Sequence, residues 1–196
     1  MLGGRAGSAA VVAQDWQNPA AERGRSPFDQ RHLLTLQGQY TSGIGAKGNP
    51  VLRDWTLASQ LNAGSGLPLT PVFFAPVRGS GVTGTLRPDY TGEPLYAASG
   101  GRNLNPAAVA APAPGRWGNA GRNSIQGPGQ WTVNASVSRT FRSNERVSLD
   151  FRVDALNVLN TVNFPAWNTI VGNPQFGLPS VASPMRTIQS TLRARF

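Results

Sequence analysis

The feature of this sequence that most limits its fold is a strict alternation of apolar and polar residues along short segments. In WTVNASVSRTF, residues 131–141, the odd-numbered positions are mostly apolar and the even-numbered ones are polar. A β-strand places successive side chains on opposite faces, so the pattern predicts a strand with one apolar and one polar face. Similar segments give the expected strands, at about residues 31–41, 51–63, 131–142, 146–157 and 185–196.

Little in the composition favours helices between these segments. The chain contains 23 glycines and 16 prolines, and only 14% of its residues are charged, where a typical soluble domain has about 25%. No helix-length window keeps an apolar period of 3.6 residues without meeting glycine or proline. We therefore predict an all-β fold with long, irregular, Gly/Pro-rich connections.

Aromatic residues at the ends of the apolar faces indicate what those faces meet. Trp131 and Phe141 are separated by roughly 33 Å of strand, which a tilt of ~40° reduces to about 25 Å, the height of the apolar band of an outer-membrane barrel. Tyr40, Trp55 and Phe196 also lie at expected strand ends on the apolar side. Because amphipathic aromatics prefer the membrane interface, we predict that these five residues mark it and that outer-membrane lipid covers the apolar faces.

The lengths of the connections support the same interpretation. They run short, long, short and long: residues 42–50, 64–130, 142–145 and 158–184. Outer-membrane barrels have short periplasmic turns and longer external loops, so we expect an antiparallel up-and-down meander of about five transmembrane strands. Residues 1–30 are then an irregular external segment and residues 31–196 the barrel segment. The long loop, residues 64–130, is too rich in proline and glycine to be expected to pack a core of its own.

Charged residues on the expected strands fall mostly on the polar faces. Asp150, Arg152 and Asp154 alternate along one face, which predicts a ladder of charges on the wall of the lumen, with a structural role or a part in the substrate path. Arg139 is the exception on an apolar face. We expect it to be tolerated because it lies close to the rim, where a long side chain can reach polar surroundings.

Motifs for a cofactor-binding, metal-binding or catalytic site are weak in this sequence. GIGAKG, residues 43–48, matches the glycine pattern of a dinucleotide site, but Asn49, Pro50 and another strand follow where a helix is required. A periplasmic turn is predicted instead. The single histidine, His32, has no carboxylate cluster nearby, and there is no cysteine, so we expect no metal, no cofactor and no enzymatic activity. The arginines are scattered, so no nucleic acid partner is expected.

Six stretches, in order along the chain, resemble the C-terminal part of TonB-dependent outer-membrane receptors of the Oar-like kind, whose members often carry a carboxypeptidase-regulatory-like domain. The most specific are GRN with GPG, at Gly121–Asn123 and Gly127–Gly129, and FRVDALNVLN, residues 151–160. The full set is SPFDQRHLLTLQGQY, NAGSGLPLT, RPDYTG, LNPAAVAAPAPGRWGNAGRNSIQGPGQWTVNASVSRTF, FRVDALNVLNTVNF and FGLPSVASPMRTIQSTLRARF.

This resemblance implies a larger fold than five strands. Such receptors form a 22-stranded barrel with an internal plug, in the outer membrane of a Gram-negative bacterium, and import substrates with energy from an inner-membrane complex. The strands here would be an open segment of that barrel, and the chain a fragment of a longer reading frame. The energy-coupling complex would act only through the missing N-terminal part, so this polypeptide alone is not expected to transport. Phe196 resembles the terminal signal that the barrel assembly machinery reads, whereas Asn134 replaces the acidic residue usual in its strand.

Ligand contacts would come from the long loop. Arg102, Arg116, Trp117 and Arg122 are the candidates there for gripping an anionic or sugar-like ligand, whose identity stays open. A secreted β-sandwich that binds carbohydrate or mediates adhesion is the alternative, because the strands of a soluble sandwich also alternate.

Overall fold

The computed structural model describes residues 13–15, 17–43, 53–74, 85–96, 100–142 and 147–196. The chain divides into two compact units. The first, here called the loop unit, comprises Met1–Arg31, Ser65–Gln130 and Phe164–Ala182; the second, the sheet unit, comprises His32–Gly64, Trp131–Asn163 and Ser183–Phe196. Most of the turn expected at residues 42–50, including all of GIGAKG after Gly43, and most of the turn expected at 142–145 lie outside the described residues.

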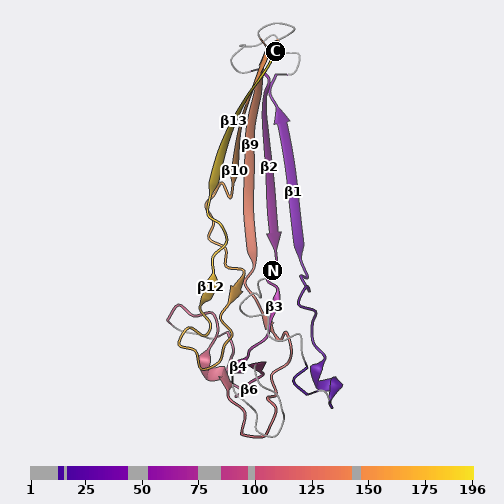
Figure 1. Cartoon of the computed structure of the whole chain (residues 1–196), viewed down its shortest axis with the longest axis vertical. Helices are drawn as coiled ribbons and strands as arrows, with labels where there is room; N and C mark the ends of the chain where they lie inside the picture. The colour runs from indigo at the N-terminus through magenta and orange to yellow at the C-terminus, as the bar shows by residue number, and fades with distance from the viewer. Residues whose placement is uncertain (1–12, 16, 44–52, 75–84, 97–99, 143–146) are drawn as a thin grey trace. The chain divides into compact units, whose positions relative to one another are not determined.

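The sheet unit is one five-stranded antiparallel meander in the order β1-β2-β9-β10-β13 (Figure 1). The fold class predicted from the alternation is therefore confirmed as an all-β antiparallel sheet. Asp54 before β2 and Asn157 after β10 have positive φ angles of 64° and 50°, and a left-handed residue cannot continue a strand. The strands are β1 (Leu33–Thr41), β2 (Trp55–Gly64), β9 (Gln130–Arg142), β10 (Ser148–Leu156) and β13 (Thr187–Arg195).

The register brings residues of like character opposite one another. Leu36 pairs with Leu61, Val137 with Val153 and Phe151 with Leu192. Directly opposite residues in an antiparallel pair point to the same face, so the apolar positions of neighbouring strands join into one apolar face. The polar positions join on the other face in the same way.

The loop unit is held by short ladders and two single-turn 3-10 helices rather than by one sheet. Each ladder pairs strands of two or three residues, far too short to bury a face alone. The helices are η1 (Pro19–Glu22) and η2 (Pro106–Ala108). The pairs are β3 (Pro68–Leu69) with β8 (Ile125–Gln126), β4 (Phe73–Phe74) with β5 (Thr85–Leu86), β6 (Asp89–Tyr90) with β7 (Val109–Ala110), and β11 (Ala166–Trp167) with β12 (Pro179–Val181).

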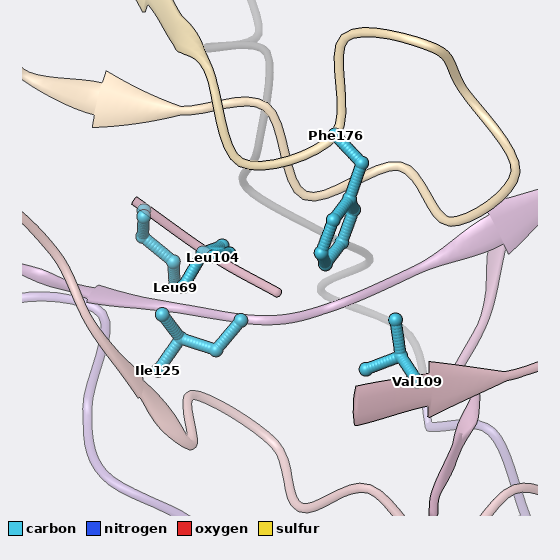
Figure 2. Packing of buried hydrophobic residues seen from close by; sticks show 5 residues of the cluster. All are labelled: Leu69, Leu104, Val109, Ile125 and Phe176. Carbon is cyan, nitrogen blue, oxygen red and sulfur yellow. The ribbon is translucent and has the colours of Figure 1, made fainter. Parts of the chain in front are cut away.

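The prediction that the long loop packs no core of its own is wrong. Leu69, Leu104, Val109 and Ile125 from that loop meet Phe176 from the connection between β10 and β13, and all five are buried (Figure 2). Leu104 and Ile125 have no exposed surface at all. Burying such side chains contributes about 1.5–3 kcal/mol each. A connection that looks irregular along the chain is therefore a packed unit once its distant parts meet.

Glycines in the GLP and GPG stretches allow two backbones to touch beside β3 and β8. A Cβ on Gly66 would lie 1.9 Å from the carbonyl oxygen of Gly127, and a Cβ on Gly127 would lie 2.5 Å from that of Leu67. The Gly127 N–H donates to the same Leu67 oxygen at 3.0 Å. Only glycine fits so close an approach without moving the backbone.

The asparagine of the GRN stretch is the centre of a buried polar network. Asn123 has a φ angle of 52°, a conformation that asparagine tolerates better than most residues. Its backbone N–H donates to the Thr70 hydroxyl and its Oδ1 accepts from that hydroxyl, both at 2.9 Å, while its Nδ2 donates to the Arg25 carbonyl at 2.6 Å. The network joins residues that lie far apart in the sequence, which explains why this motif has a specific polar residue.

The N-terminal segment is attached to the loop unit by a buried ion pair. Arg87 Nη1 donates to Glu22 Oε2 at 2.7 Å, and the two side chains are only 8% and 10% exposed. Gln14 adds a second link, because its side chain accepts from the Arg87 N–H at 2.6 Å and donates to the Gly118 carbonyl at 3.1 Å. Residues 13–31, expected to be an irregular external segment, are thus docked onto the long loop.

Acidification is expected to weaken this attachment. Burial disfavours the charged carboxylate of Glu22, but the hydrogen bond and charge of Arg87, with the backbone N–H groups of Asp15 and Gln14, outweigh it and lower its pKa below the ordinary 4.5. Stability from a lowered pKa is present above pH 4.5 and is lost as pH falls through the lower, folded-state pKa. Thermal unfolding between pH 7 and pH 3 measures this loss.

Two variants isolate the contribution of Glu22 from that of the other carboxyl groups. Glu22→Gln should lower stability at neutral pH and flatten its dependence on pH below 4.5. Glu93→Gln, at an exposed position, should leave the profile of the parent chain unchanged. Equal profiles for the two variants would contradict the assignment.

Candidate functional site

The apolar face of the sheet unit is uncovered. Tyr40, Ile188 and Leu192 are 63–67% exposed, and Phe196 beyond the end of β13 is fully exposed. Trp131 and Phe141, the expected interface residues at the two ends of β9, are 44% and 41% exposed. A β-sandwich requires the apolar face of each sheet to be buried against the other. Among the described residues this face has no such second layer, which argues against the sandwich alternative.

Arg139 lies within an aromatic cluster on this apolar face. Its guanidinium carbon is 4.5 Å from the centre of the Phe141 ring and 5.5 Å from that of Trp55. The Trp55 ring in turn meets the edge of Phe151 at a centroid distance of 6.5 Å. Cation–π contacts of this kind stabilise a cation in surroundings with little water. The structure thus places Arg139, the one charged residue on the apolar face of the described strands, beside two aromatic rings. The sequence pattern did not predict this contact.

The polar face carries the three charges expected on the wall of the lumen, arranged as two separate ion pairs. Arg152 and Asp154 pair with each other at 2.7 Å. Asp150 instead binds Arg195 at 3.0 Å and accepts from the Thr140 hydroxyl at 2.7 Å. Arg195 was not among the predicted residues, because only the pairing of β10 with β13 brings it near. Exposed ion pairs contribute little stability, so these charges mainly set the character of the surface.

A hollow of about 450 Å³ lies on this polar face. It is lined by the Arg152–Asp154 pair of β10 and by amide side chains from β1, β2 and β9. These amides are Gln37, Gln39, Gln60 and Asn134. Asn134, at the position where the resembling receptors have an acid, accepts a hydrogen bond from the Asn157 N–H at 3.0 Å. The amide therefore fixes the end of β10, a role for which a neutral side chain is sufficient.

A second hollow, in the loop unit, is here called the loop groove. It has a volume of about 550 Å³ and is bounded by three stretches of chain: residues 73–74, 102–111 and 171–176. Its floor includes the buried Phe73, Val109 and Phe176, and the exposed Phe74 lies at its edge. Because these stretches are distant in sequence, no local pattern could have indicated the groove.

Of the four ligand-contacting residues predicted in the long loop, the structure places only Arg102 at this groove. Its guanidinium donates to the backbone oxygen of Pro174 at 2.6 Å and to that of Phe176. Arg116 is exposed, and Trp117 and Arg122 are half-buried; none of the three lines the groove. This groove therefore does not bring the four residues together. The residues that sequence reasoning missed are apolar, and nothing distinguishes them from core residues in the sequence.

The part of the chain that the structure describes contains no cluster of side chains typical of a metal site. No group of three or more His, Asp or Glu side chains there could hold a metal ion. His32 lies at the start of the sheet unit and is exposed. No helix among the same residues has the length and apolarity needed to cross a membrane.

Comparison with known proteins gives one match. The model of a family described as "outer membrane beta barrel domain" matches residues 2–189, almost the whole chain and parts of both units. No curated protein and no solved structure matches the chain.

Proposed function

Because the chain belongs to the outer membrane beta barrel domain family, and is therefore an outer-membrane protein, we propose that its sheet unit is a stretch of the wall of a TonB-dependent receptor. In this proposal the loop unit is the external region that binds the imported substrate. The protein catalyses no reaction. Its task is to bind a substrate and, as part of the complete receptor, to admit it across the outer membrane.

The contrast between the two faces of the sheet carries the proposal. One face exposes leucine, isoleucine, tyrosine and phenylalanine side chains over all five strands or their ends. The other presents amides, hydroxyls and paired charges. Barrel strands in outer membranes alternate in this way, with the apolar side toward lipid and the polar side toward the lumen. On this basis Asp150, Arg152 and Asp154 face the lumen.

The edges of the sheet support a barrel larger than five strands. In the described sheet β1 and β13 each have one neighbour, so each presents an unpaired edge. The smallest bacterial barrels have eight strands, and exposed edges invite aggregation. Further strands therefore pair with both edges, in agreement with the 22 strands of plugged transporters.

Two partners follow from this proposal. An inner-membrane complex supplies the energy for import, acting on a part of the receptor outside these two units. Phe196, fully exposed beyond β13, is the residue that the barrel assembly machinery reads.

Sequencing the genomic DNA upstream of the Met1 codon tests the receptor proposal directly. We expect the same reading frame to continue upstream and to encode further alternating strands and a plug. An in-frame stop codon followed by a secretion signal immediately before Met1 would contradict it. In cells expressing the complete frame, the protein should be recovered in the outer-membrane fraction and require detergent for release.

A further inference from the structure

We infer that the loop groove is a binding site for a small molecule with a flat apolar body and an anionic group, held by Phe74 and its neighbours and by Arg102. This inference rests on the proposed function, since it names the chemical class of the substrate that the external region recognises. Three observations support it: the rigidity of the groove, the character of its lining and the place of Arg102, the one cation among the described lining residues.

The walls of the groove are fixed to one another by backbone hydrogen bonds. Val72 N–H donates to Thr169 at 3.0 Å, and Val171 N–H donates back to Val72 at 2.7 Å, so the stretch before β4 is tied to the stretch around residue 171. Asn103 N–H donates to the Gly177 oxygen at 2.8 Å. This bond ties the third wall, residues 102–111, to the chain just after residues 171–176. A groove whose walls are already joined loses little conformational entropy when a ligand enters.

The lining favours an apolar ligand of limited size. Phe73, Phe74, Val109, Val171 and Phe176 are among the residues that line the groove, and exposed Ala111 lies beside them. A volume of about 550 Å³ lies within the range of roughly 300–1,000 Å³ typical of small-molecule sites. Phe74, exposed although it lies next to the buried Phe73, gives a ring against which a flat molecule can stack.

Arg102 determines the charge of the ligand. Two of the five N–H donors of its guanidinium bind the carbonyls of Pro174 and Phe176. These contacts hold the group at the groove, and its other donors make no hydrogen bond with the described residues. Among the described residues that line the groove there is no aspartate or glutamate and one arginine, so its electrostatic character is positive. A carboxylate is the group that a fixed guanidinium binds best.

The test uses 2-naphthoate as a probe and 2-naphthylmethanol as its neutral counterpart. Binding to the full chain in detergent micelles is measured by equilibrium dialysis, with protein-free micelles as the blank and the far-UV strand signal as the check of folding. We expect saturable binding of 2-naphthoate with a Kd on the order of 10–100 μM. The neutral compound should bind about tenfold more weakly.

Two variants assign this binding to the groove. Arg102→Gln should weaken binding of 2-naphthoate about tenfold and leave the neutral compound nearly unaffected. Its control is Arg116→Gln, which removes the same charge from an exposed position outside the groove. Ala111→Trp, which fills the groove without touching the contacts of Arg102, should weaken both compounds at least tenfold. Its control is Ala113→Trp, at an exposed position that does not line the groove.

The outcomes separate this inference from the receptor proposal. Absence of saturable binding by the folded chain, or equal losses in Arg102→Gln and Arg116→Gln, would overturn the groove assignment whatever lies upstream of Met1. Saturable binding lost only in the groove variants would support it, even where the upstream reading frame contradicts the receptor.

Discussion

Phe176→Ala is expected to lower the free energy of unfolding of the loop unit by about 3–5 kcal/mol, the usual cost of removing a buried phenylalanine. Phe176 is 2% exposed and belongs to one cluster with the other four core residues (Figure 2). The half-buried Tyr90 and Trp167 pack against this cluster. Phe176 comes from a different stretch of chain than the other four core residues, so its loss both leaves a cavity and separates the connections. Denaturant unfolding followed by hydrogen exchange of the loop-unit amides measures the loss.

The matched control for this prediction is Phe74→Ala. It removes the same side chain from a position that is 63% exposed, where a change within about 0.5 kcal/mol is expected. The amides of β9 and β10 should keep their protection in both variants, because these strands belong to the other compact unit. Similar losses for Phe74→Ala and Phe176→Ala would mean that the loop unit has no specific core.

Val137→Arg is expected to destabilise the membrane-inserted sheet by about 2–4 kcal/mol, the cost of an arginine on the lipid face at the bilayer midplane. Val137 lies near the middle of the stretch from Trp131 to Phe141 and directly opposite Val153 on the apolar face. Urea titration of the complete receptor folded into phosphatidylcholine vesicles measures the effect, because the further strands then pair with both edges of the sheet.

Ser136→Arg is the matched control, since it adds the same side chain one residue away on the opposite face. Asp154 lies directly across from Ser136, so the added cation meets a carboxylate on a polar surface. We expect a change within about 0.5 kcal/mol. A larger loss for Ser136→Arg than for Val137→Arg would reverse the assignment of the lipid face.

The strands could be predicted because their signal is local. Alternation along residues 131–141 and 147–155 is enough to define two faces, and the observed pairing of Phe141 with Leu149 and of Ala135 with Ala155 follows from matching those faces. A shift of one residue would turn every apolar side chain to the polar face. The charges on β10 were placed on one face for the same reason.

The loop unit could not be predicted in this way. Its core joins Leu69, Leu104 and Ile125 to Phe176, residues separated by long stretches rich in glycine and proline. No periodicity marks them, because each belongs to a ladder of two or three residues or to none. For the same reason Arg102, Arg116, Trp117 and Arg122 were grouped by chemistry alone, and only one of them lies at the groove.

The sequence by itself determined the meander, its two faces and the kind of surroundings that each face suits, since side-chain direction in a strand depends only on position along the chain. The tertiary structure alone decided that the connections pack a core, that Glu22 pairs with Arg87 and that a groove opens beside Arg102. Those contacts join residues that no local rule relates. They form only because burying apolar side chains from several stretches together offsets the conformational entropy that the loops lose when they become ordered.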